Sequence, residues 1–271
     1  MTTYIVLDTE RRYDRVAHAR YQQSERFDPD IMSGDYTPEH ALNTPRWVLH
    51  ELTAVCWMAL SDEGEALSPV DMRSIGLPET DEKEALKALF EFIAMIEGEV
   101  KLVTWGGAIA EVPMILAAAS THQLVLPPRL RPLAEAGFRH DHPHIDLMHR
   151  FCGQAQRVHL AEFAARLEIP AKITCRPDQV SRLMEQGKWA SVKAVCEGDV
   201  LTTAALLARY LHMICKAPTP FITDRGLCRY VRPNLGRREF AVDFARWEAR
   251  QQIAAFARAE MERKILGTCF R

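Results

Sequence analysis

The first clear pattern in the chain is a run of apolar, β-forming residues at 4–7 that ends in alternating acids. Asp8 and Glu10 follow the run, one residue apart. Because side chains at i and i+2 of an extended chain point to the same face, the pattern predicts a buried strand over residues 4–8 that holds two carboxylates side by side. Like charges so placed repel each other and push one of them toward protonation, so a compensating group is expected nearby.

Later apolar runs predict the other strands of one sheet. Residues 52–61 and 66–75 read as strands that form a meander with 4–8, a fourth strand is predicted at 100–105, and residues 144–151 read as a strand that leads into a helix. Apolar positions at helical spacing predict helices at 80–98, 111–120, 160–167, 177–187, 189–212 and 239–264. A meander favours antiparallel pairing, and later helix–strand alternation favours parallel crossovers. We therefore expect an α/β fold with a mixed five-stranded sheet flanked by helices. The polar stretch 11–45 reads as a long loop with room for a short helix.

The C-terminal part differs in charge from the rest of the chain. Residues 216–271 carry twelve Lys and Arg against six Asp and Glu, a local charge of +6, and since the whole chain has a net charge of −2, residues 1–215 carry −8. We predict a domain over 1–215 and a basic, helical C-terminal extension over 216–271. Such an extension could hold a phosphate backbone, although a solvated helix surface has the same signature and is the more ordinary explanation.

Composition narrows the class of protein. The chain has 271 residues, of which 48% are hydrophobic and 26% charged, as in ordinary soluble globular proteins. No apolar run reaches the roughly 18 residues of a membrane span, and no signal peptide is evident. The seven cysteines include no CxxC pair, which argues against a disulfide framework and a structural zinc site. The cytoplasm is the expected compartment.

Two further acids, Asp199 and Glu111, lie at positions where they could join Asp8 and Glu10 in a site. Asp199 lies three residues after Cys196 and seven after Val192, which places it on the apolar, inward face of the helix at 189–212. Burying an unpaired carboxylate is costly. Glu111 begins the helix that follows strand 100–105, where the helix dipole also favours an acid.

Each of these acids has an ordinary structural explanation, but their combination points to a metal centre. If strand 4–8 is central, four carboxylates from three distant segments converge at the carboxyl edge of the sheet. A pair of divalent cations would relieve their repulsion, and hard oxygen ligands suit Mg²⁺ or Mn²⁺.

The order of the motifs resembles a known family. The motifs VLDTE, LVTWGGAIAEVPMI, HIDLMHRF and VCEGDVLTTAALLARYL, within residues 3–213, resemble those of the DEDD superfamily of 3′–5′ exonucleases, which have a ribonuclease H-like fold. They are most similar to predicted exonucleases related to the proofreading domain of family B DNA polymerases. The resemblance implies two metal ions, held by Asp8, Glu10, Glu111 and Asp199, that hydrolyse the terminal phosphodiester of a single-stranded 3′ end of DNA or RNA.

The chain departs from the family pattern at several positions. Relatives usually have Asp at the place of Glu111. They also have a Tyr four residues, or a His five residues, before the final Asp, where this chain has Val195 and Ala194. Two functions therefore stay open: a metal-dependent 3′–5′ exonuclease, and a catalytically weak or inactive nucleic-acid-binding protein that retains the fold.

A histidine-rich segment at 139–149 offers a substitute for the missing general base. We name His142 and His144 as its candidates. The segment has the residue types of a transition-metal site, which would suit a zinc-dependent hydrolase, but its spacing matches no zinc motif, and a polar loop entering a strand is the more ordinary explanation.

Contacts with nucleic acid are predicted at Thr9, Trp105 and Gly107, which lie within the resembling motifs. Single strands usually stack on aromatic side chains, for which Trp47 and Tyr13 are further candidates. Tryptophans near strands, however, more often belong to the core.

Overall fold

The structure is a computed structural model that describes residues 1–23, 47–64, 66–135, 143–171, 175, 177–217 and 219–269. Its centre is one sheet with the strand order β3-β2-β1-β4-β5. The strands are β1 (Thr2–Tyr13), β2 (His50–Asp62), β3 (Leu67–Gly76), β4 (Glu99–Thr104) and β5 (His144–Asp146). β1 pairs antiparallel with β2 and parallel with β4, β2 pairs antiparallel with β3, and β4 pairs parallel with β5. The predicted mixed five-stranded sheet flanked by helices is confirmed.

β1 is longer than its apolar run indicates. It continues to Tyr13, which is level with His50 of β2, so the predicted loop at 11–45 begins later than expected. A short helix, α1 (Arg15–Gln22), follows and is capped by Asp14, whose Oδ1 accepts from the N–H groups of Val16 and Ala17. The rest of the predicted loop, from residue 24, lies outside the described residues.

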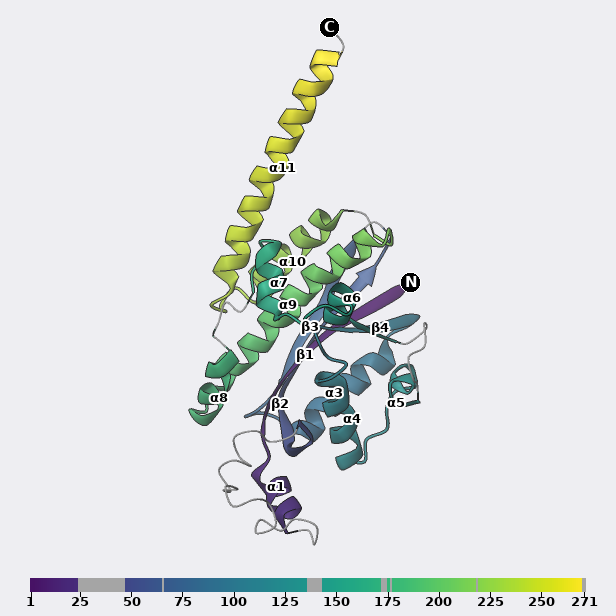
Figure 1. Cartoon of the computed structure of the whole chain (residues 1–271), viewed down its shortest axis with the longest axis vertical. Helices are drawn as coiled ribbons and strands as arrows, with labels where there is room; N and C mark the ends of the chain where they lie inside the picture. Colours follow the sequence, from purple (N-terminus) through teal and green to yellow (C-terminus); the bar gives the residue numbers. More distant parts are fainter. Residues whose placement is uncertain are drawn as a thin grey trace.

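Helices cover both faces of the sheet (Figure 1). They are α3 (Glu82–Met95), α4 (Glu111–Thr121), α5 (Pro132–Glu135), α6 (Leu147–Cys152), α7 (Leu160–Arg166), α8 (Pro177–Glu185), α9 (Trp189–Met213), α10 (Pro220–Asn234) and α11 (Ala241–Cys269), with 3₁₀ turns η1 (Trp47–Leu49) and η2 (Pro128–Leu130). Within the described ranges, none of these helices combines the length and the apolar character needed to span a bilayer.

Alternation along β1 decides which layer each side chain joins. Ile5 and Leu7 belong to a hydrophobic cluster with α3 and α4, whereas Tyr4 and Val6 belong to a cluster with α9. Because i and i+2 share a face, Asp8 continues the series of Tyr4 and Val6, and its carboxylate is directed to the α9 side of the sheet.

The C-terminal extension is built into the core. Phe240 is 0% exposed and Phe244 1%, and both lie in the same cluster as α9 and the sheet. Two parallel hydrogen bonds of 2.8 Å join Arg209 of α9 to Asp224 of α10. The predicted boundary at 215/216 therefore falls inside one continuous hydrophobic cluster. The later part of α11 extends away from the body, toward the C-terminus (Figure 1).

Candidate active site

Just after its two acids, β1 has an irregularity in its pairing with β2. Asp8 is level with Cys56 and Glu10 with Ala54, but the register shifts between Glu10 and Arg11. Thr53 of β2 is therefore left without an opposite residue, and its hydroxyl donates to the carbonyl oxygen of Glu10 at 3.0 Å. A bulge of this kind bends a strand locally and re-aims side chains, here immediately after the two acids.

α9 brings the third acid to the same side of the sheet. Asp199 is 6% exposed and lies one helical turn after Cys196. Burial raises the pKa of the Cys196 thiol well above its usual value, and so do the neighbouring Cys56 thiol and the negative charges of Asp8 and Glu10. Both carboxylates of β1 thus act electrostatically on the turn of α9 that carries Asp199.

Glu111 is the fourth acid and lies at the first position of α4. Its Oε2 is buried and has no hydrogen-bond partner. Burial is the main cause that raises the pKa of Glu111 to about 7; the charges of Asp146 and Asp199 raise it further, and Arg11 opposes them. Glu111 and Asp199 are therefore within electrostatic reach of each other, although they come from helices on different faces of the sheet.

The turn before Glu111 contains two glycines and is held in place by Asp146. Gly106 has φ +83°, which favours glycine, and a β-carbon on Gly107 would lie 2.3 Å from the Thr104 hydroxyl oxygen. Asp146, at the end of β5, accepts from the N–H of Gly106 at 2.9 Å and from that of Ala108 at 3.0 Å. Asp146 is a functional residue that the sequence patterns did not predict. Its position between a short strand and a helix was the available signal, because Asp146 also caps α6.

His144 has a place in this turn that differs from the predicted general base. It is 8% exposed, and its Nε2 lies 2.8 Å from the Thr104 hydroxyl oxygen, which in turn accepts from the Gly107 N–H. Thr104 follows Leu102 by two residues, and Leu102 belongs to the cluster with α3 and α4. The ring nitrogen of His144 therefore contacts a side chain on the opposite face of the sheet from the Asp8 carboxylate. His142 lies outside the described residues.

The predicted contacts with nucleic acid have internal partners. The Trp105 ring packs 5.3 Å from that of Phe163, and its N–H donates to the Val158 carbonyl oxygen at 3.3 Å, so it is largely occupied by the core. Gly107 donates within its own turn. Thr9 lies on the face of β1 away from Asp8, by strand alternation. Their roles in binding nucleic acid stay predictions.

Candidates for stacking in the N-terminal part are placed differently. Trp47 is 42% exposed, in the 3₁₀ turn before β2. Tyr13 is half-buried and makes edge contacts with the rings of His18 and His50. Trp47 is thus the better placed of the two for contact with a base.

The positions that hold Tyr or His in relatives are apolar and buried here. Val195 is 1% exposed and Ala194 5%. Val195 packs with Ala54, Val180 and Met184. No polar group from these two positions can orient a water molecule.

The four acids offer the carboxylate oxygen ligands that hard divalent cations prefer. Asp199 acts electrostatically on Glu111, Asp8 and Glu10 act on Cys196 in the turn before Asp199, and the buried Oε2 of Glu111 has no hydrogen-bond partner. Among the side chains that the structure describes, however, no three His, Cys, Asp or Glu already form a cluster that could hold a metal ion. The donor set is suitable, but the ligand arrangement is not preassembled.

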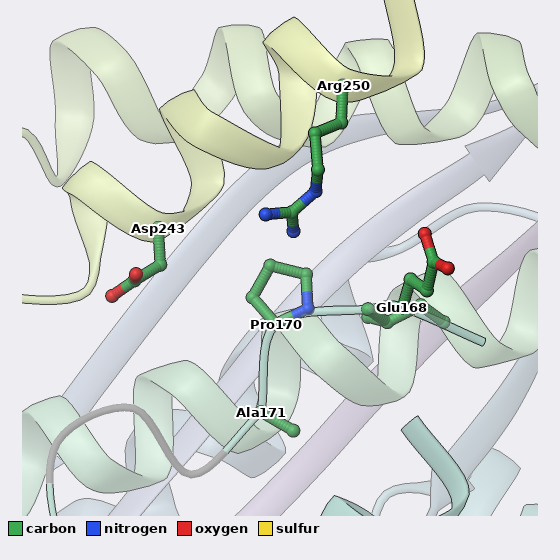
Figure 2. A pocket seen from close by; sticks show the side chains of 6 residues that line it. Glu168, Pro170, Ala171, Asp243 and Arg250 are labelled. Atoms are coloured by element: carbon green, nitrogen blue, oxygen red, sulfur yellow. The ribbon is translucent and has the colours of Figure 1, made fainter. Parts of the chain in front are cut away.

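A separate cavity of about 600 Å³ lies between the turn after α7 and the start of α11 (Figure 2). Glu168, Asp243 and Arg250 line it, together with Ile169, Pro170 and Ala171. Two carboxylates outnumber the single guanidinium, so the cavity offers no net attraction to a phosphate, and it holds none of the four acids.

The sheet has the order β3-β2-β1-β4-β5, and β2 runs antiparallel to both of its neighbours. Its central strand, β1, carries acids after its apolar run. These features are consistent with the ribonuclease H-like class of α/β proteins. The family model of predicted 3′–5′ exonucleases related to the exonuclease domain of PolB matches residues 44–219. The match covers more than half of the chain, and the protein belongs to this family. A search of curated proteins gave no match.

The matched segment includes Glu111 and Asp199 but begins after Asp8 and Glu10. The assignment of the two β1 acids therefore rests on their place in the fold. The helices α10 and α11 lie entirely beyond the match.

Proposed function

We propose that the protein is a metal-dependent 3′–5′ exonuclease that removes terminal nucleotides from single-stranded DNA or RNA. Membership of the exonuclease family supports nuclease chemistry in general. The observation that carries the proposal is that the acids of β1 and the acid of α4 both lie within electrostatic reach of the turn of α9 that carries Asp199. The charge of Asp199 raises the pKa of Glu111, and those of Asp8 and Glu10 raise the pKa of the Cys196 thiol.

Asp8, Glu10, Glu111 and Asp199 would hold two Mg²⁺ or Mn²⁺ ions. When bound, such ions supply activation of the attacking water and offset the charge that develops on the leaving 3′-oxygen. Asp8 is the expected bridging ligand, since β1 is the central strand. Glu111, whose pKa is raised to about 7, must lose its proton before it can ligate a cation.

At the two positions where relatives carry Tyr or His, this chain has no side chain that can act as a general base. Val195 and Ala194 are apolar and buried, and the ring nitrogen of His144 is engaged with Thr104. His142 is the remaining candidate named from the sequence. The four acids would then contribute by holding the cations in place, because carboxylates alone repel the scissile phosphate and offsetting its negative charge is the main task in phosphoryl chemistry.

A second candidate function is nucleic-acid binding without catalysis. The raised pKa of Glu111 and the apolar side chain of Val195 favour it, as does the lack of a preassembled three-ligand cluster among the described side chains.

A labelled oligonucleotide separates these two functions. The full chain is incubated with Mn²⁺ and a 5′-labelled single-stranded DNA or RNA, and an exonuclease yields a ladder that shortens from the 3′ end and stops with EDTA. Asp199→Asn should abolish the ladder, whereas Asp71→Asn, at an exposed ion pair with Arg73 on β3, should leave it intact. Binding without any ladder would support the second function. An equal ladder from the Asp199 variant would show that these acids are not the site.

A further inference from the structure

Arginines are concentrated in α10 and in the turn that follows it, beyond the family match. Between residues 225 and 238 there are five Arg and no Asp or Glu. Arg225, Arg229 and Arg232 lie on α10 at spacings of four and three, which places them on one face of the helix. Arg237 follows in the turn after α10. We call Arg225, Arg229, Arg232 and Arg237 the arginine row.

Three members of the row have no acidic partner. Arg232 pairs with Glu248 of α11, but no ion pair in the described part of the chain involves Arg225, Arg229 or Arg237. Arg229 and Arg237 are exposed, and the buried Nε of Arg225 has no acceptor.

The nearest acid within α10 is already neutralised. Asp224 is 2% exposed and takes both of its hydrogen bonds from Arg209 of α9. The row therefore presents positive charge that the protein itself does not balance.

The arginine row lies along α10, and α10 runs toward the acidic site. Asp224, near the start of the helix, contacts Arg209, and Arg238, just after its end, contacts Glu197 at 2.6 Å. Because Glu197 lies two residues before Asp199, α10 runs back along α9 to the turn that carries that acid. Arg225 and Arg232 are about 10 Å apart along the helix, at about 1.5 Å per residue, a length that allows contact with more than one phosphate of a backbone.

We propose that the arginine row binds the phosphate backbone of a single-stranded nucleic acid, outside the acidic site, and guides the strand toward Asp199. The inference rests on the proposed function for the identity of the ligand, and it extends that function to a segment beyond the family match. Guanidinium groups suit phosphate, since they stay charged and donate in a planar fork.

The test measures binding without hydrolysis. Fluorescence anisotropy with labelled oligo-dT and oligo-U, in EDTA, gives Kd as a function of NaCl for the full chain. In single-stranded complexes each phosphate contact contributes about 0.7 to the slope of log K against log salt. The variant Arg225→Gln/Arg229→Gln/Arg237→Gln should therefore lose about 2 from the slope and bind about 100-fold more weakly at 0.1 M salt, with the difference vanishing near 1 M.

A matched control removes the same charge elsewhere. Arg246, Arg258 and Arg263 are exposed on α11, and their triple change to Gln should leave the slope unchanged. Should the first triple variant be unstable, Arg229→Gln/Arg237→Gln, at two exposed positions, should weaken binding about 25-fold at 0.1 M salt.

Equal losses in the row and control variants would overturn the proposal, since net charge alone would explain them, and so would no loss in either. Row-dependent binding to vesicles containing phosphatidylserine, with unchanged oligonucleotide binding, would instead assign the surface to a membrane. The assay needs no catalysis, so failure of the exonuclease assay leaves this test intact.

Discussion

Replacing Glu111 with Gln should stabilise the metal-free protein at high pH. Burial raises the pKa of Glu111 from 4.5 to about 7. Because the folded protein then binds a proton more tightly than the unfolded chain, this group's contribution to stability is full below about pH 4.5 and is lost as the pH rises through 7. At about 1.4 kcal/mol for each tenfold change, the ionised side chain costs up to about 3 kcal/mol at pH 8 and less than about 1 kcal/mol at pH 5.

The assay is urea unfolding in EDTA at pH 5 and pH 8. Glu111→Gln removes the ionisation, so it should gain up to about 3 kcal/mol over the wild type at pH 8 and little at pH 5. Titrating groups that do not interact with Glu111 are common to both proteins and cancel in the difference. A gain that is the same at both pH values, or a loss at pH 8, would refute the reasoning.

Glu99→Gln is the matched control. Lys101 and Thr2 donate hydrogen bonds to the Glu99 carboxylate and lower its pKa. Its contribution is therefore present above the unfolded pKa and lost as the pH falls, so this variant should be the less stable protein at pH 8. Added Mn²⁺ should stabilise the wild type at pH 8 more than it stabilises Glu111→Gln, because the neutral amide is a weaker ligand than the carboxylate.

Three further changes test the supports of the site by urea or thermal unfolding. Gly107→Ala places a methyl group 2.3 Å from a threonine hydroxyl oxygen and should cost about 1–3 kcal/mol. Arg209→Ala leaves the buried Asp224 without its partner and should cost about 3–5 kcal/mol, so an unchanged Tm would contradict the role of this pair. Phe240→Ala, at a side chain 0% exposed, should cost about 3–5 kcal/mol. Phe256→Ala, at 65% exposure, should change stability by less than about 0.5 kcal/mol, and equal costs for the two would argue that the extension is not part of the core.

Local patterns predicted much of the sheet and of the acidic site. Alternation on β1 places Asp8 and Glu10 on one face, and helical spacing turns Asp199 inward, where it is 6% exposed. Both rules depend only on residues a few positions apart. The position of Glu111 at the start of α4 follows equally from the strand and glycine turn before it.

Other features depended on partners that are distant in the sequence. The helix α10 was not predicted, because Gly226 and Pro233 interrupt its pattern. Tertiary packing compensates: the glycine lets α10 approach Pro69 of β3, where a β-carbon would lie 3.2 Å from the proline ring. Trp105 was named as a candidate contact with nucleic acid, and its ring packs against Phe163 of α7, a partner distant in the sequence.

The sequence by itself determined which side chains each strand and helix directs inward, since that is set by backbone periodicity. Only the tertiary structure decided that the last helices complete the same core, that Asp146 holds the turn before Glu111, and that the pKa of Glu111 lies near 7. The physical reason is that burial and charge at a point depend on everything packed around it, and these neighbours come from all parts of the chain.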